Sequence, residues 1–281
     1  MAVTPSNVRP PSAEPSWVRW GTWMLLPPEG SANRLPLRVR VLNWLAAFLI
    51  FGLLICLPFT TLTMTWDWAG VYAYRTKFVE GYLLTIGISV VALLLSVLIG
   101  LCSALASSTR LLALRYTNRI YIDLVRGTPL LVQILILYYV TANAFGINNR
   151  FVAGSLILSF SYGAYISEVI RGGIESVAKS QLESAKAIGL NRVQTYRYVI
   201  FPQAIRQMLP SLAGQFVSLI KDTSLLSVIA LGEFTMNARD TSNLTYSTLE
   251  CYIPLAVGYL ILTIPITQLT RYLETRSRFE N

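Results

Sequence analysis

The chain contains no histidine and only three cysteines in 281 residues. Enzymes that hydrolyse or oxidise substrates inside membranes usually need histidines, paired acids or clustered cysteines, so this composition argues against a catalytic chain. Cys56, Cys102 and Cys251 each lie within or beside an apolar run. We therefore interpret them as small buried apolar side chains, and we predict neither a metal site nor a disulfide.

Charge is also scarce. Charged residues make up 13% of the chain and hydrophobic residues 54%, whereas a soluble domain carries about a quarter charged residues. The apolar runs reach roughly 20 residues without strict alternation, which is typical of an all-α integral membrane protein. The first 40 residues lack the early apolar core that a signal peptide would have. We therefore expect them to form a cytoplasmic tail. Six spans are predicted, at about 41–64, 81–107, 120–145, 151–171, 208–232 and 251–271.

The basic residues predict how these spans are oriented. If the long basic loop 172–207 is cytoplasmic, only four of the 23 Lys and Arg residues fall outside, and nineteen fall inside or at the inner boundary. Those four are Arg75, Lys77, Arg150 and Arg239. This bias puts both termini in the cytoplasm, and it explains the net charge of +9 without a nucleic-acid partner.

The segment QLESAKAIGLNRVQTYRYVIFP, residues 181–202, indicates two short helices inside that loop. Gly189 fits a C-cap of the first helix, Asn191 an N-cap of the second, and Pro202 a point where the second helix ends or bends. Small side chains at Ser184 and Ala185 would allow a partner surface to approach closely. The pattern alone also fits an ordinary amphipathic loop lying on the membrane face.

The same segment resembles the "EAA" loop of ABC importer permeases, in which E-A-A, three residues, Gly, nine residues and I-x-L-P follow one another. The matching positions are Glu183, Ala185, Gly189 and Pro202, whereas Ser184, Val199 and Phe201 depart from the consensus but keep small or apolar character. Three further runs resemble the permeases of polar amino acid uptake systems: RGTPLLVQ (126–133), YISEVIRGGIESV (165–177) and KDTSLLSVI (221–229). The resemblance covers about residues 80–272.

This resemblance implies the fold of a type I ABC importer permease, with a five-helix core and one additional N-terminal helix, in the inner membrane of a bacterium. The implied organisation has four parts: a tail at 1–40, an additional helix and external loop at 41–80, a transmembrane domain at 81–272, and a cytoplasmic tail at 273–281.

The resemblance also implies partners: a cytoplasmic ABC ATPase dimer that binds ATP and Mg²⁺, a second permease subunit that is identical or homologous, a solute-binding protein outside, and a polar amino acid as cargo. Membrane lipid surrounds the chain. The sequence has no G-x-x-x-x-G-K-[ST] motif, so we expect it to bind no nucleotide or other cofactor itself. The residues implied to couple to the ATPase are Glu183, Ser184, Ala185, Gly189 and Pro202.

Several polar residues fall inside predicted spans, where an exposed charge costs roughly 2.5–3.5 kcal/mol. Lys221, Asp222, Thr223 and Ser224 lie near the middle of the fifth span, Glu168 near the inner end of the fourth, and Gln133 in the third. Such residues line a translocation path or hold helices together. They also leave open an ion-coupled secondary transporter that uses Lys221, Asp222 and Glu168.

Spacing predicts what two of the acidic residues do. Glu168 and Arg171 are three residues apart, which suits an ion pair within one helix. Asp123 and Arg126 repeat this spacing, and the same kind of pair is predicted for them.

Overall fold

The computed structural model describes residues 37–61 and 66–277, and these ranges consist of helices joined by short connections, without a β-strand. The chain divides into an N-terminal unit, residues 1–65, and a main unit, residues 66–281. In the N-terminal unit, α2 (Leu37–Thr61) is a single apolar helix that matches the predicted first span. The cytoplasmic tail predicted at 1–40 lies outside the described residues except for its last four.

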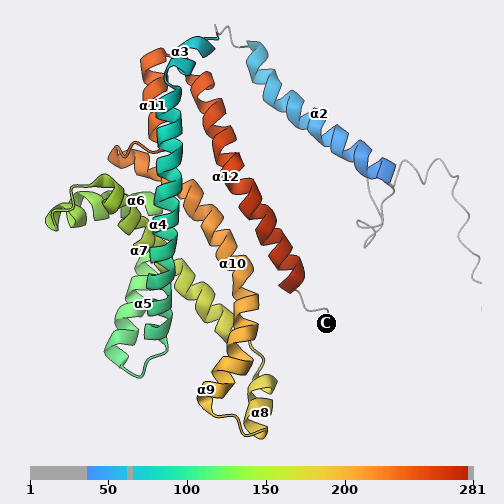
Figure 1. Cartoon of the computed structure of the whole chain (residues 1–281), viewed down its shortest axis with the longest axis vertical. Helices are drawn as coiled ribbons and strands as arrows, with labels where there is room; N and C mark the ends of the chain where they lie inside the picture. Colours follow the sequence, from blue (N-terminus) through green and yellow to red (C-terminus); the bar gives the residue numbers. More distant parts are fainter. Residues whose placement is uncertain (1–36, 62–65, 278–281) are drawn as a thin grey trace, which may run out of the picture. The chain divides into compact units, whose positions relative to one another are not determined.

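The main unit contains the remaining helices (Figure 1). They are α3 (Trp68–Ala73), α4 (Arg75–Ser107), α5 (Leu112–Gly127), α6 (Leu130–Ile136), the π-helical η2 (Leu137–Ala142), α7 (Arg150–Glu175), α8 (Lys179–Ala187), α9 (Arg192–Thr195), the π-helical η3 (Tyr196–Ile200), α10 (Phe201–Asp222), the 3₁₀-helical η4 (Thr223–Ile229), α11 (Phe234–Thr245) and α12 (Thr248–Ser277). We had predicted that residues 66–80 form an external loop that belongs with the additional helix. They belong to the main unit instead, because α3 packs on α4, α11 and α12.

Five helical segments of the described chain are long and apolar enough to cross a membrane, and a bent pair would make a sixth. That pair replaces the single helix predicted at 120–145: residues 112–127 and 130–142 form two pieces bent by 114°. The predicted span is therefore divided at residues 128–129, a bend that the apolar run did not indicate. Pro129 has no amide hydrogen to donate, and it keeps Thr128 extended at φ −117° and ψ 145°.

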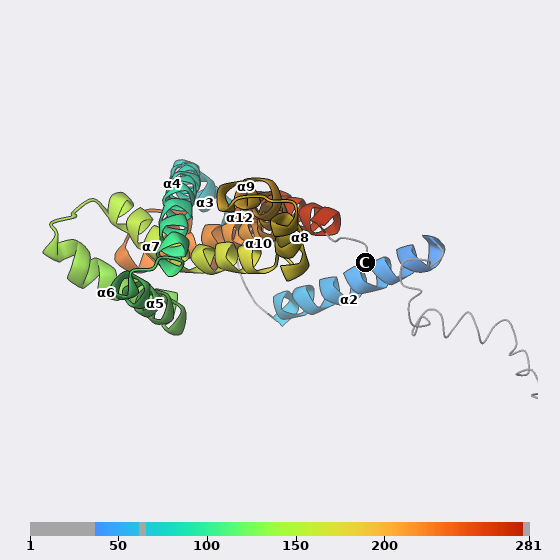
Figure 2. The same cartoon turned by 90° about the horizontal axis from the view of Figure 1, so that it is seen from below.

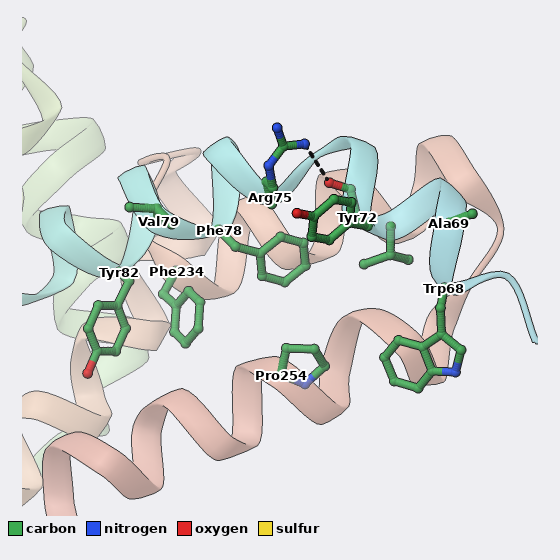
Figure 3. A pocket seen from close by; sticks show the side chains of 10 residues that line it. Trp68, Ala69, Tyr72, Arg75, Phe78, Val79, Tyr82, Phe234 and Pro254 are labelled. Carbon is green, nitrogen blue, oxygen red and sulfur yellow. Dashed lines mark hydrogen bonds between the residues drawn. The ribbon is translucent and has the colours of Figure 1, made fainter.

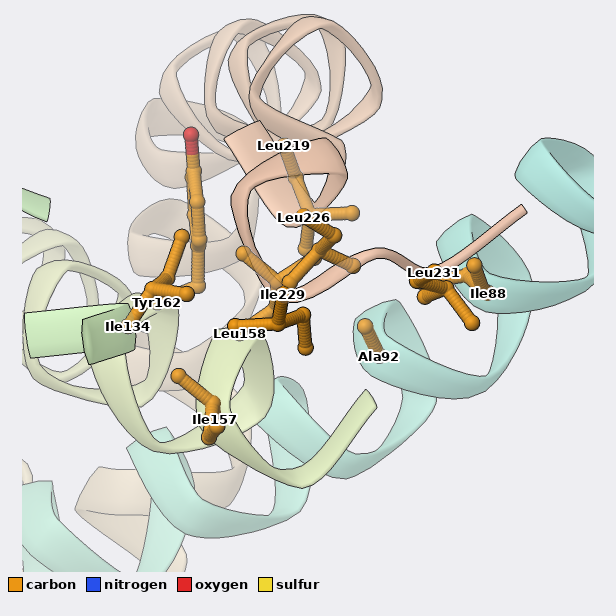
Figure 4. Packing of buried hydrophobic residues seen from close by; sticks show 10 residues of the cluster. All are labelled: Ile88, Ala92, Ile134, Ile157, Leu158, Tyr162, Leu219, Leu226, Ile229 and Leu231. Atoms are coloured by element: carbon orange, nitrogen blue, oxygen red, sulfur yellow. The ribbon is translucent and has the colours of Figure 1, made fainter. Parts of the chain in front are cut away.

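The core lies where α4, α7, α10 and η4 meet, and it is shown in Figure 4. Ile88 and Ala92 from α4 pack with Leu158 from α7 and Leu226 from η4. Small residues let α4 and α7 approach closely: a Cβ on Gly163 would lie 2.5 Å from the side chain of Ile99. Helices that associate in lipid gain from such close packing, because lipid chains are as apolar as the side chains they would replace.

The cysteines differ from their predicted burial. Cys251 is fully buried, as predicted, but Cys56 and Cys102 are exposed on the surfaces of α2 and α4. Their neighbours on these surfaces are large apolar side chains such as Leu53 and Leu105. The prediction was wrong for these two residues because an apolar run in a membrane helix faces lipid as readily as it faces a protein core.

Candidate functional site

The predicted pair of short helices lies at the end of the main unit opposite α3 and α11 (Figure 1), and Figure 2 views the molecule from this end. Helix α7 continues to Glu175 and the long helical segment begins at Arg192, so residues 176–191 connect these two elements and contain α8. Within this connection, α8 is the only helix longer than one turn.

The end of α8 confirms the prediction for Gly189. Gly189 has φ +80°, in the left-handed region that favours glycine. The amide of Leu190 donates to the carbonyl of Ala185, and the amide of Gly189 donates to that of Lys186, both at 3.0 Å. These two bonds form a Schellman motif, which satisfies the last carbonyls of α8 and fixes the direction of the chain after it.

The start of the second helix confirms Asn191 as its N-cap. The Asn191 side chain accepts from the amide of Gln194, and the Gln194 side chain accepts from the amide of Asn191, both at 2.9 Å. This reciprocal pair is a capping box. Only the four residues 188–191 therefore separate α8 from α9, and hydrogen bonds hold both Gly189 and Asn191.

Pro202 neither ends nor breaks the helix. The π-helical turn η3 precedes α10, and Pro202 lies at the second position of α10. A π-helical turn is wider than an α-helical one, and it accommodates a residue that can donate no backbone hydrogen bond. Because of this turn, residues 192–229 run as one continuous helical segment from α9 into the membrane-spanning part of α10.

Apolar side chains attach α8 to both neighbouring spans. Leu182 packs on a cluster that contains Val177, Ile200 and Ala204. Ala185 is only 3% exposed. We had expected Ala185 to face a partner surface, and this was wrong, since it packs against the chain itself. The burial fixes α8 to the end of α7 and the start of α10.

The outer face of the loop combines charged and apolar groups. Glu183 and Ser184 are exposed, and Ile188 and Val193 are each 75% exposed. A groove of about 430 Å³ lies beside Val193, between Arg192 and Phe201. Exposed apolar side chains next to charged ones are typical of a surface that binds another protein.

A second polar region lies where α10 gives way to η4. The hydroxyl of Tyr162 on α7 donates to a carboxylate oxygen of Asp222 at 2.6 Å, which ties the two helices together. Lys221 is exposed, and none of the ion pairs among the described residues includes it. Thr223 and Ser224 donate to carbonyls of the preceding turn. Among residues 221–224, Lys221 is therefore the one whose side chain has neither a hydrogen bond nor an ion pair with a described residue.

Glu168 forms the predicted pair with Arg171 at 2.9 Å, and it also pairs with Arg126 on α5 at 2.8 Å. The pair predicted between Asp123 and Arg126 was wrong, because Asp123 instead lies 3.7 Å from Arg119, one turn earlier. Spacing within one helix could not indicate that Arg126 would reach a neighbouring helix.

Gln133 holds the bend between α5 and α6 and does not line an open path. Its amide nitrogen donates to the carbonyls of Val125 and Thr128 at 2.7 and 2.9 Å, and its amide oxygen accepts from Ser161 at 2.7 Å. The side chain is buried. The bend at Pro129 frees backbone carbonyls from the helical ladder, and Gln133 satisfies two of them.

The sequence did not indicate Glu233 as important, although its side chain is fully buried. It caps α11 by accepting from the amides of Thr235 and Met236 at 2.8 and 2.7 Å. A glutamate at an N-cap is less common than Ser, Thr, Asp or Asn, so the usual start signal was absent.

Residues 96–279 match the family described as "binding-protein-dependent transport system inner membrane component". This chain belongs to that family. The permease is 35% identical over 217 residues to the glutamine transport system permease protein GlnP of Escherichia coli (strain K12), covering 76% of this chain and 99% of the relative. It is 35% identical over 201 residues to the probable glutamine ABC transporter permease protein GlnM of Bacillus subtilis (strain 168), covering 72% and 93%.

Solved structures agree. The permease resembles an amino acid ABC transporter crystallised with histidines at a TM-score of 0.70 and 34% identity, covering 76% of this chain and all of that one. An inward-facing structure of the MetNI methionine ABC transporter shares the fold, with a TM-score of 0.58, 15% identity and coverage of 70% and 96%. The resemblance to amino acid ABC permeases is confirmed, and the chain is a permease subunit of an ABC importer. Nothing supports the secondary transporter considered above.

Proposed function

We propose that this permease moves polar amino acids, with glutamine as the first candidate, and that a separate pair of ABC ATPases supplies the energy. Several relatives named as glutamine permeases support this cargo. The absence of a phosphate-binding G-x-x-x-x-G-K-[ST] motif supports a separate source of ATP hydrolysis, with ATP and Mg²⁺ on that partner. A second permease subunit and a solute-binding protein complete the proposed importer.

The orientation follows from charge. In the proposal, α8, α9 and both termini are cytoplasmic, and α3 and α11 lie on the other side of the membrane. Lys179, Lys186, Arg192 and Arg197 cluster on the connection after α7 and the helix that follows it, whereas α11 contributes Arg239 as its only basic residue. This distribution agrees with the excess of Lys and Arg in cytoplasmic loops.

The loop residues are proposed to transmit motion from the ATPase. Glu183 and Ser184 form the contact surface on α8, and Gly189 fixes the angle between α8 and α9. Ala185 holds α8 on the spans, and Pro202 lies where the loop passes into α10. The helical segment from Arg192 to Ile229 is the single observation that carries this proposal, because it connects the loop to the apolar part of α10 without an intervening non-helical residue.

Lys221 is proposed to line the translocation path. Its ammonium group is exposed and unpaired among the described residues, and it could pair with the carboxylate of an amino acid. Asp222, Thr223 and Ser224 hold the place where α10 changes into the 3₁₀-helical η4. Glu168 fixes α5 to α7 at the end where α8 lies. Inside this path, Lys221 is therefore the residue expected to influence the choice of cargo.

Charge reversal at Glu183 tests the proposed function. The tagged full-length permease is purified in mild detergent from its own cells, and the chains bound to it are identified by mass spectrometry. We expect an ATPase and a second permease with the wild type, and loss of the ATPase alone with Glu183→Lys. Glu80→Lys is the matched control, because Glu80 is exposed on α4, far along the chain from the loop.

Two results would overturn this assignment. One is an ATPase retained in equal amount by Glu183→Lys, which would remove Glu183 from the contact. The other is uptake of labelled glutamine by proteoliposomes that contain the permease alone with an ion gradient. If neither glutamine nor another polar amino acid is taken up by the complete complex, the proposed cargo is wrong while the coupling role stands.

A further inference from the structure

An apolar cavity of about 690 Å³ opens at the end of the main unit that carries α3, away from α8 and α9 (Figure 1). Its wall is formed by side chains from α3, α4, α11 and α12 (Figure 3). The wall includes Trp68 from α3, Phe78 and Val79 from α4, Phe234 from α11 and Pro254 from α12. Its volume lies within the range of about 300–1,000 Å³ that is common for small-molecule sites.

The chemistry of this wall does not suit the proposed cargo. A polar amino acid carries an ammonium and a carboxylate, and each loses its hydration unless the site replaces it with hydrogen bonds or opposite charges. The ten residues around the cavity are aromatic or aliphatic apart from Arg75, and they include no acid. A hydrocarbon chain needs no polar partner, so the cavity suits an acyl chain.

Arg75 supplies one positive charge at the edge of the cavity. Its guanidinium carbon lies 4.7 Å from the centre of the Tyr72 ring, and its Nη1 donates to the Tyr72 carbonyl at 3.3 Å. None of the ion pairs in the described part of the chain includes Arg75. A basic side chain near the end of a span, beside an apolar pocket, is suited to the phosphate of a lipid headgroup.

The aromatic residues place this edge at the boundary of the bilayer. Trp68 and Tyr72 lie on α3 within one turn of each other, and Trp66 stacks on Trp68 with ring centres 5.9 Å apart. Trp and Tyr concentrate at membrane interfaces, where their rings contact both hydrocarbon and water. From Arg75 to Tyr82 the wall follows α4 for about 10 Å into the span.

We propose that this cavity binds one anionic phospholipid from the membrane leaflet opposite α8. An acyl chain lies against Phe78, Phe234 and Pro254, and the headgroup phosphate pairs with Arg75. The bilayer is as apolar as the cavity, so transfer of the acyl chain contributes little to selectivity. Arg75 therefore determines which lipid is retained, and a lipid without net charge is retained less than an anionic one.

Native mass spectrometry of the full-length protein in detergent tests this site. Phosphatidylglycerol and phosphatidylethanolamine are added in equal amounts, and the lipids that remain bound are counted. We expect the wild type to retain one phosphatidylglycerol with at least a five-fold preference, and Arg75→Ala to lose that preference. Lys77→Ala is the matched control, because Lys77 stacks on Tyr74 at 5.6 Å and does not line the cavity.

A second pair of variants tests the cavity itself. Val79→Trp enlarges a side chain that lines the cavity, and we expect it to abolish retention of both lipids. Leu83→Trp adds the same ring one turn along α4, on an exposed residue outside the cavity, and should retain lipid as the wild type does. Three results would overturn the proposal. The wild type could retain both lipids equally, or Val79→Trp could retain lipid as the wild type does. The third is a wild-type dimer without lipid that Val79→Trp dissociates, which would make this face a contact between two copies of the chain.

Discussion

Replacement of Gly189 tests whether the direction of the chain after α8 matters for transport. A Cβ at Gly189 would meet no atom within 4 Å, so a substitution costs backbone strain alone. An L-residue in the left-handed region loses about 1–2 kcal/mol, which corresponds to a factor of about 5–30 in the population of the locally open loop. Asn tolerates this region better than Ala, and a β-branched residue tolerates it least.

We therefore expect transport to fall in the order Gly, Asn, Ala, Val at position 189. Hydrogen exchange of the amides in residues 183–190 should accelerate in the same order, by about 5–30-fold for Gly189→Ala. The measurements are uptake of labelled glutamine by the complete complex in proteoliposomes, and exchange followed by mass spectrometry.

Gly146 provides a matched control, because it has φ +68° and equally open space at its Cβ position, but it precedes α7 on the other side of that span. The same substitutions there should leave coupling to the ATPase unchanged. If Asn at position 189 impaired transport more than Ala did, side-chain volume and not backbone geometry would matter. That result would refute the reasoning.

Three other perturbations have expected outcomes. Lys221→Met should change the relative uptake of acidic, neutral and basic amino acids, whereas an equal fall for all of them would remove Lys221 from the path. Tyr162→Phe removes the hydrogen bond to Asp222 and should lower the free energy of unfolding in detergent by about 0.6–1.7 kcal/mol. The control is Tyr165→Phe, because the Tyr165 hydroxyl has no hydrogen bond among the described residues. Gly163→Val forces α7 away from Ile99 and should destabilise the protein by about 1–3 kcal/mol. Gly172→Val in the same helix meets no neighbour and should not destabilise it. Equal stability of the two variants would contradict the close packing of α4 on α7.

Local signals predicted the two caps in the loop. Gly189 and Asn191 act through hydrogen bonds to residues within five positions, so their roles follow from spacing alone. The apolar runs likewise indicated the spans, because burial in lipid requires a length that the sequence displays directly.

Contacts between distant segments were not predictable in this way. The partners of Arg126 and Gln133 come from α7, 42 and 28 residues further along the chain, and depend on the 114° bend at Pro129. Glu233 on α11 was overlooked for a similar reason, because Tyr259, which donates to its carboxylate at 3.3 Å, lies on α12. A proline in the sequence indicates that a helix is interrupted at that residue. It does not predict the angle of the bend or which neighbouring helix the bend brings into contact.

The π-helical turn before Pro202 has a geometric consequence for the import cycle. Residues 192–229 run as one helical segment, so about 30 residues and about 45 Å of helix separate Arg192 from Asp222. If this segment tilted as one body by about 5° about its Arg192 end, its Asp222 end would shift by about 4 Å. Such a tilt would displace Lys221 by about 4 Å, a distance comparable to the size of the passage that a small solute needs.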